Sequence, residues 1–184
     1  MNHYIQPETL PEDNKNLGWL YQEILSWCNG DVLDYGCNNC NLNGYFCINV
    51  NSYTGVDLPE VIRKFKLKDA ITPMQFLLSK KKYDTIVLAN VIEHIENHTS
   101  LINSLIKRLN KGGRMIIVVP NLQSTKKAIA SLIGRKLGAD KYHIHGFTTA
   151  EINNLANLNS MACYNYYAPT LKKEFIISIW NKRR

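Results

Sequence analysis

Acidic and small polar residues follow the predicted strands of this sequence in four places. Asp34-Tyr35-Gly36 ends the first strand, and Asp57 ends the second strand about 20 residues later. Asp69 ends the third strand, and Asn90 and Glu93 follow the fourth. A glycine turn between a strand and a helix lets a ligand approach the backbone, and the helix N-terminus offers free N–H groups. An acid at this distance beyond the turn suits a bidentate grip on ribose hydroxyls.

The elements that must position these residues alternate between strands and helices. Apolar residues at helical spacing predict helices over 17–28, 42–48, 73–80 and 101–109, and a single turn at 59–62. Short apolar runs predict strands over 31–36, 53–57, 65–67, 84–89, 115–120, 161–167 and 174–180. A last helix begins after Thr148, where Glu151 completes a capping box. This alternation predicts an α/β fold with a mainly parallel sheet and a final antiparallel hairpin.

Length and composition bound the class of protein. The chain has 184 residues, a net charge of +7 and 45% hydrophobic residues, which is typical of one globular domain over 1–184. No apolar run approaches the roughly 20 residues of a membrane span, and the N-terminus lacks the pattern of a secretory signal. Five cysteines without an export signal favour free thiols and a cytoplasmic location. The charge favours an anionic partner or a solvated lysine-rich surface.

Taken together and in order, these segments resemble the class I S-adenosylmethionine-dependent methyltransferases. Five segments carry the resemblance: Val32–Asn38, Gly55–Leu58, Tyr83–Ile95, Leu109–Asn121 and His145–Ile152. The resemblance implies a Rossmann-like seven-stranded, mainly parallel sheet with helices on both faces and a C-terminal antiparallel hairpin. It also implies an N-terminal extension over 1–16 and a substrate-cover insertion over 121–147.

The resemblance implies S-adenosyl-L-methionine as cofactor and S-adenosyl-L-homocysteine as product. It assigns these residues to the cofactor site: Asp34, Gly36, Cys37, Asn38, Asp57, Leu58, Asp69, Ala70, Ala89 and Asn90. Asp34 and Gly36 match the positions that hold the methionine end. Asp57 matches the ribose-binding acid, with Leu58 beside the adenine, and Asp69 or the alanine after it meets the adenine amino group. Ala89 and Asn90 match the segment near the reactive methyl.

One departure from the family pattern concerns the glycine turn. The family has three glycines at alternate positions, whereas Asn38 and Cys40 hold the second and third here. Asn tolerates positive φ better than other non-glycine residues, so we expect Asn38 to keep the turn. The alternative is a non-catalytic nucleotide-binding scaffold with a decayed pocket. Cys37, Cys40 and Cys47 could also form a metal or redox site, but small buried thiols are the favoured interpretation.

The pair Glu93-His94 resembles pairs in ubiquinone-biosynthesis O-methyltransferases and in small-RNA 2′-O-methyltransferases. A divalent site built from this pair, Asn90 and one of His143 and His145 is one interpretation. The favoured interpretation has no metal: Glu93 caps the following turn, and His94 packs over the cofactor pocket. His94, His143 and His145 are the candidate catalytic bases, because imidazole titrates near neutral pH.

The acceptor side depends on the segment between Asn121 and Tyr142. Its apolar stripe with nearby lysines and arginines is typical of a membrane-surface or anion-binding helix, although a plain packed helix explains it equally well. We therefore expect methyl transfer to a small-molecule or lipid-/sugar-linked acceptor, with peripheral membrane contact through 121–142. An RNA methyltransferase is the alternative enzyme, disfavoured because no basic stripe with interleaved aromatic residues is evident.

Overall fold

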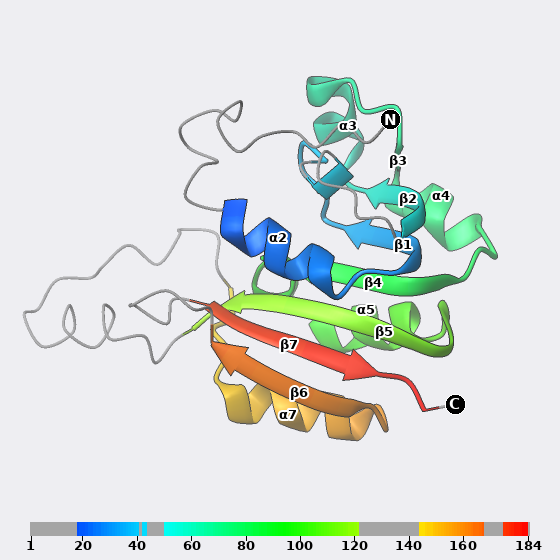
Figure 1. Cartoon of the computed structure of the whole chain (residues 1–184). Helices are drawn as coiled ribbons and strands as arrows, with labels where there is room; N and C mark the ends of the chain where they lie inside the picture. The colour runs from blue at the N-terminus through cyan, green and yellow to red at the C-terminus, as the bar shows by residue number, and fades with distance from the viewer. Residues whose placement is uncertain (1–17, 41, 44–49, 122–143, 168–174, 184) are drawn as a thin grey trace, which may run out of the picture. The chain divides into compact units, whose positions relative to one another are not determined.

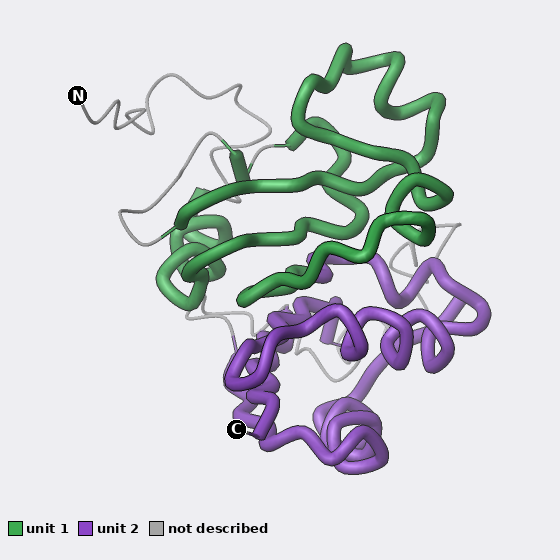
Figure 2. The backbone as a smooth tube through the Cα atoms, turned by 90° about the vertical axis from the view of Figure 1, so that its right-hand side faces the viewer, with its two compact units in different colours: residues 1–87 green, residues 88–184 purple. Residues whose placement is uncertain are grey.

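The computed structural model describes residues 18–40, 42–43, 50–121, 144–167 and 175–183 (Figure 1). These residues form two compact units that divide in sequence between Val87 and Leu88 (Figure 2). The strand order is β3-β2-β1-β4-β5-β7-β6 in a seven-stranded sheet. The α/β fold class predicted from the sequence is therefore confirmed, with a mixed sheet whose C-terminal strands are antiparallel.

The first unit contains the parallel part of the sheet. Its elements are α2 (Gly18–Ser26), β1 (Gly30–Tyr35), β2 (Val50–Val56), α3 (Pro59–Phe65), β3 (Ala70–Ile71), α4 (Pro73–Leu78) and the beginning of β4 (Tyr83–Ala89). Strand β1 pairs with β2 on one side and with β4 on the other, and β2 pairs with β3. Because every pair is parallel, the carboxyl ends of these strands lie at one edge.

The second unit contains the antiparallel part of the sheet. Its elements are the 3₁₀ turn η3 (Ile92–His94), α5 (His98–Ile106), β5 (Leu109–Pro120), α7 (Thr149–Leu158), β6 (Ala162–Tyr167) and β7 (Phe175–Asn181). Strand β7 lies between β5 and β6, antiparallel to both. Helix α7 begins at the predicted capping box, in which Thr148 Oγ1 accepts from the Glu151 N–H and the Glu151 carboxylate accepts from the Thr148 N–H.

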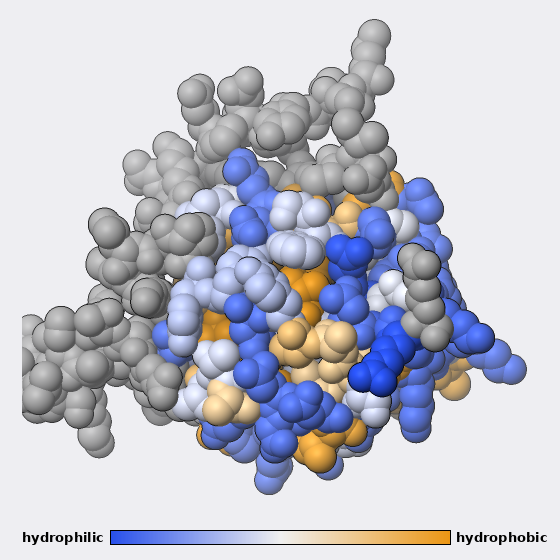
Figure 3. Space-filling view, turned by 60° about the horizontal axis from the view of Figure 1, so that its bottom comes forward, coloured by the Kyte–Doolittle hydropathy of each residue, from blue (hydrophilic) through white to orange (hydrophobic). Residues whose placement is uncertain are grey.

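Each unit has a core of wholly buried strand residues. In β5 the run Met115–Val119 has no exposed surface, which is the burial expected of an interior strand. Trp180 of β7 is equally buried, and its Nε1 donates to Ser178 Oγ at 2.7 Å. On the face seen in Figure 3, hydrophobic residues form small groups among hydrophilic ones. None of the helices in the described part of the chain has the length and hydrophobicity that a bilayer span requires.

The prediction of a strand over 65–67 is wrong, and the position of Asp69 relative to the third strand changes as a result. Phe65 is the last residue of α3, and Lys66 adopts a left-handed conformation with φ 52° that ends the helix. Such a cap turns the chain away from the helix axis, so the strand starts only at Ala70. Asp69 therefore precedes β3 instead of ending it.

The boundary between α5 and β5 also differs from the prediction. The helix was expected to reach Leu109, but it ends at Ile106, and β5 begins at Leu109 instead of Met115. Lys182 Nζ donates to the carbonyls of Ile106 and Leu109 at 3.0 and 2.9 Å. This ammonium satisfies backbone acceptors at the junction, which lets the chain leave the helix there. Of the helix expected over 42–48, all but residues 42–43 lies outside the described residues.

We predict that Gly30→Ala lowers the free energy of unfolding by about 1–3 kcal/mol, the cost of a left-handed non-glycine residue. Gly30 has φ +62°, and a Cβ there would overlap the Asp84 carboxylate. That carboxylate accepts from the Asp31 N–H at 2.9 Å and ties β1 to β4. Urea denaturation measures the change.

Gly18→Ala is the matched control, because a Cβ at Gly18 meets no atom of the described residues within 4 Å. Alanine there should leave stability unchanged or raise it by about 0.5–1 kcal/mol. Equal urea midpoints for the two variants would contradict the role given to Gly30.

Candidate cofactor site

The turn after β1 holds three alternate residues in the left-handed region. Gly36 has φ 82°, Asn38 has φ 48° and Cys40 has φ 56°. These are the three positions at which the family pattern has glycine, so the backbone conformation is kept although two of the glycines are replaced. The expected positive φ of Asn38 is confirmed. That Cys40 shares it was not expected, and a cysteine in this region carries strain of about 1–3 kcal/mol.

The turn is tied to the end of β2. The β1–β2 register pairs Tyr35 with Val56, so Gly36 lies level with Asp57. The N–H groups of Gly36 and Cys37 donate to the Val56 carbonyl at 2.8 and 3.2 Å. The Asn38 N–H donates to Asp57 Oδ2 at 2.7 Å. These bonds bring the first and second predicted site segments together.

Asp57 combines two backbone contacts with spare acceptor capacity. Its Oδ1 accepts from the Leu58 N–H at 2.7 Å, while its Oδ2 accepts from the turn. A carboxylate has about four lone-pair sites, so two remain for a diol. Leu58, next along the chain, is 52% exposed and offers an apolar surface beside this carboxylate. These residues fit the ribose and adenine of a nucleoside.

Asp34 is the buried acid of the site. Its side chain is 4% exposed, and Tyr53 Oη donates to Asp34 Oδ2 at 2.8 Å. Burial, against the opposing effect of the Tyr53 hydrogen bond and with a smaller contribution from the Asp57 charge, raises the pKa of Asp34 to about 7. Tyr53 was not predicted as a site residue from the sequence. The one feature that could have indicated it is its position on the adjacent strand, where it pairs with Val32.

Asp69 lies apart from the carboxyl end of β3. Its carbonyl accepts from the Gly55 N–H at 2.8 Å, and its side chain accepts from Asn43 Nδ2 at 2.9 Å. Ala70 pairs with Gly55, whereas Asp57 donates its N–H to the Ile71 carbonyl at 3.2 Å. Ile71 is therefore the β3 residue beside Asp57, and the expectation that Asp69 ends that strand is corrected.

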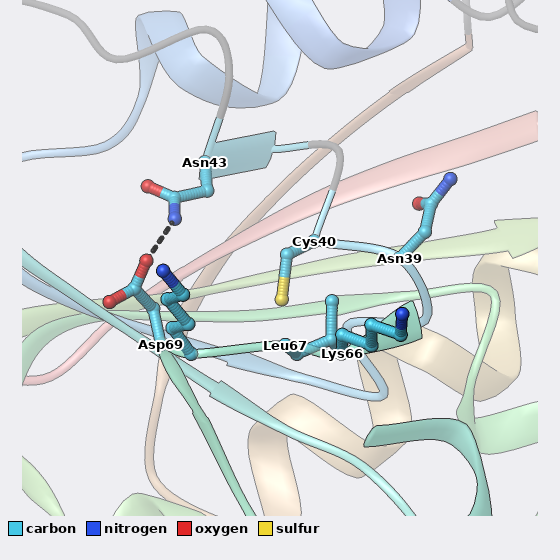
Figure 4. A pocket seen from close by; sticks show the side chains of 7 residues that line it. Asn39, Cys40, Asn43, Lys66, Leu67 and Asp69 are labelled. Carbon is cyan, nitrogen blue, oxygen red and sulfur yellow. Dashed lines mark hydrogen bonds between the residues drawn. The ribbon is translucent and has the colours of Figure 1, made fainter. Parts of the chain in front are cut away.

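A cavity of about 420 Å³ adjoins Asp69 (Figure 4). It is lined by Asn39, Cys40, Asn43, Lys66, Leu67, Lys68 and Asp69. The Cys40 sulfur points into this cavity from the turn, and Asn43 reaches the Asp69 carboxylate across it. This cavity could not be predicted from sequence patterns, because it depends on the left-handed cap at Lys66.

Two further predicted cofactor residues belong to the second unit. Ala89 ends β4, and Asn90 follows it with φ 55° and donates its N–H to the Val118 carbonyl at 2.9 Å. Asn90 Oδ1 is buried, and no hydrogen-bond partner for it lies among the described residues. This amide oxygen is available to a donor.

Of the three candidate bases, the structure describes His94 and His145. The Glu93 carbonyl accepts from the His145 N–H at 3.1 Å, so the backbones of these two residues lie side by side. The His145 ring stands edge-on to His98 at 4.8 Å, and its Nε2 lies 3.3 Å from the Glu96 carbonyl. His94 lies in η3, while His143 lies outside the described residues.

His98 was missed by sequence reasoning, although it stands four residues after His94. Its ring also meets Phe147 edge-on at 5.3 Å. Burial lowers the pKa of His98, and the neighbouring His145 lowers it further. In the described ranges, no three His, Cys, Asp or Glu side chains form a group that could hold a metal ion.

Comparison with solved structures finds methyltransferases of the same fold. Magnesium protoporphyrin IX methyltransferase from Synechocystis PCC 6803, with bound SAH, superposes with a TM-score of 0.66 at 15% identity over 95% of this chain and 89% of that chain. A SAM-dependent methyltransferase from Archaeoglobus fulgidus gives a TM-score of 0.66 at 15% identity over 96% and 95%. The plantazolicin methyltransferase BpumL, in complex with a triazolic desmethylPZN analog and SAH, gives a TM-score of 0.64 at 19% identity over 90% of this chain and 81% of that chain.

Comparison with protein families matches residues 8–159 to the methyltransferase domain family. The search of curated proteins finds no significant match. The family match covers most of the sequence, and the fold and strand order agree with it. The chain therefore belongs to the methyltransferase domain family, within the class I S-adenosylmethionine-dependent methyltransferases.

Proposed function

We propose that this protein transfers a methyl group from S-adenosyl-L-methionine to a small-molecule or lipid-/sugar-linked acceptor, releasing S-adenosyl-L-homocysteine. One observation carries the proposal: the turn after β1 keeps three left-handed positions and bonds directly to Asp57. A scaffold that had lost cofactor binding would have no need to hold Asn38 and Cys40 in a strained conformation.

The first unit supplies the residues that would bind the cofactor. Asp57 accepts hydrogen bonds from the ribose hydroxyls, and Leu58 packs beside the adenine. The turn through Gly36 and Asn38 lets the ligand approach the backbone closely. Asp34 pairs with the charged methionine end. The cofactor supplies a methyl group on a positively charged sulfur, and the protein accelerates its transfer chiefly by holding acceptor and methyl in line.

The acceptor side rests on the second unit. Asn90, with its buried Oδ1, offers an acceptor to the substrate, and His94 and His145 are candidates to remove a proton. Two solved neighbours are named for different molecules, magnesium protoporphyrin IX and plantazolicin, which supports a fold that accommodates dissimilar acceptors. The family match and fold alone therefore leave the acceptor class as our proposal.

A lipid-linked acceptor, membrane contact through 121–142, and likeness to the ubiquinone-biosynthesis branch stay predictions of the sequence. The segment that would carry the membrane contact, apart from Asn121, lies outside the described residues. No described contact favours nucleic acid over a small acceptor.

Asp57→Ala should weaken S-adenosylhomocysteine binding about tenfold to a hundredfold. The change removes a charged acceptor that would hold the ribose, a loss of roughly 1.5–3 kcal/mol. Isothermal titration calorimetry measures the affinity. Glu60→Ala is the matched control, because Glu60 is an exposed carboxylate three positions along the chain in α3. Unchanged affinity in Asp57→Ala would refute the ribose assignment.

Asn38→Gly should preserve cofactor affinity, whereas Asn38→Val should reduce it about tenfold. Glycine adopts φ 48° freely, while a β-branched residue there is strained by about 1–2 kcal/mol. Asn39→Val is the control, since the next residue lies outside the left-handed region. The same calorimetric titration applies, and equal affinities for glycine and valine at position 38 would show that the turn does not shape the site.

Cofactor affinity should rise with pH through about 7. Below the raised pKa, Asp34 is protonated and neutral, so it loses its attraction for the ammonium of the methionine end. With a pKa of about 7, the affinity at pH 6 should be about tenfold lower than at pH 8.

Asp34→Asn should flatten this pH profile, because the amide cannot ionise. Titrations of both proteins in buffers of different ionisation enthalpy would detect proton release by the wild type alone. A pH profile that is equally steep in Asp34→Asn would assign the proton to another group.

A further inference from the structure

Cys37 and Cys40 are already arranged as a pair. The Cys40 N–H donates to the Cys37 carbonyl at 2.8 Å, which closes a turn of the chain. A turn closed in this way brings the two Cα atoms within about 7 Å, close to the range of roughly 4.4–6.8 Å found in disulfides. The two Sγ atoms lie 3.5 Å apart, with the Cys40 thiol donating to the Cys37 sulfur. Both cysteines are free.

Because Gly55 has no side chain, there is room beside it for both thiols. A Cβ at Gly55 would lie 2.7 Å from Cys37 Sγ and 3.1 Å from Cys40 Sγ, so both sulfurs rest on the same bare stretch of β2. Glycine at position 55 is therefore required for the two thiols to pair, because a larger residue would push the sulfurs away.

The two thiols differ in access. Cys37 is 6% exposed, whereas Cys40 is partly exposed and its sulfur points into the cavity lined by Lys66 and Lys68 (Figure 4). Among the charged residues that line this cavity, Lys66 and Lys68 outnumber Asp69, so the net positive charge would attract an anionic reagent. Cys40 can thus meet a reagent from outside, whereas within the described part of the chain the Cys37 thiol is paired with Cys40.

We propose that Cys37 and Cys40 form a reversible redox site that reacts with anionic low-molecular-weight disulfides, of which oxidised glutathione is the type. The Cys40 thiolate attacks one sulfur of the reagent, whose S–S bond breaks and releases one thiolate. The Cys37 thiolate then attacks the Cys40 sulfur of the mixed disulfide, forming the Cys37–Cys40 bond and releasing the second thiolate. Two protein thiols are oxidised, one reagent disulfide is reduced to two thiols, and the two protons pass to the released thiolates.

Local electrostatics agree with this division of roles. When Cys40 ionises, the Cys37 thiol donates the hydrogen bond to the Cys40 thiolate, which lowers the pKa of Cys40 and raises the pKa of Cys37. Because the thiolate is the nucleophile, the thiol with the lower pKa and better access attacks first.

Oxidation would act on the turn that carries the cofactor contacts. The Sγ atoms must approach from 3.5 Å to the disulfide bond length of about 2.05 Å, and Asn38, which bonds to Asp57, lies between the two cysteines. We expect oxidation to weaken S-adenosylhomocysteine binding at least fivefold, the lower end of ordinary coupling between sites. This consequence, unlike the disulfide itself, rests on the proposed function.

The test treats the full chain with oxidised glutathione and maps the products by mass spectrometry of peptides. In the wild type, we expect the peptide with Cys37 and Cys40 to lose two hydrogens, and dithiothreitol to reverse the change. Cys37→Ser should stop at the mixed disulfide and carry one glutathionyl group on Cys40. Cys40→Ser should leave Cys37 unmodified.

Cys163→Ser and Cys47→Ser are controls and should both form the Cys37–Cys40 bond. Wild-type protein that keeps both thiols, or glutathionylation of Cys37 in Cys40→Ser at the wild-type rate, would overturn the site. Calorimetry on the oxidised protein then tests the coupling, and affinity equal to that of the reduced protein would refute it. Failure of the reduced protein to bind S-adenosylhomocysteine would count against the proposed function and leave the disulfide result standing.

Discussion

The candidate site depends on a backbone constraint in the turn after β1. Gly36, Asn38 and Cys40 all have positive φ, and this alternation folds the chain back so that successive N–H groups face the end of β2. The Asn38 N–H then reaches Asp57 at 2.7 Å. Only glycine adopts such angles without strain, so the turn persists because its hydrogen bonds to β2 outweigh the strain at the other two positions.

The acids at this turn are held in opposite ways. Asp57 accepts two backbone hydrogen bonds of 2.7 Å, from the N–H groups of Asn38 and Leu58. Asp34 is buried, and burial raises its pKa to about 7 although the Tyr53 hydrogen bond opposes the shift. A buried acid of this kind is poorly stabilised until a cation arrives beside it, and the positively charged methionine end would supply one. The first unit thus carries a group whose ionisation is costly without a ligand.

Sequence patterns predicted the parts of the site that depend on strand ends. Apolar strands that end at Asp34 and at Asp57 were the basis of the site prediction, and the parallel register of β1 and β2 brings these ends together. The patterns failed where one residue's conformation decides the course of the chain. The left-handed Lys66 ends α3 later than expected and puts Asp69 before β3. Contacts between side chains on neighbouring strands, such as that of Tyr53 with Asp34, leave no mark in local periodicity.

A crystal structure of the protein with S-adenosylhomocysteine would test most directly whether the turn after β1 and Asp57 bind the cofactor. In that complex we expect the ribose hydroxyls to lie within hydrogen-bond distance of the Asp57 carboxylate. We also expect Gly36, Asn38 and Cys40 to keep positive φ. Ligand bound elsewhere on the chain, or a turn that has lost its left-handed residues in the complex, would contradict this assignment.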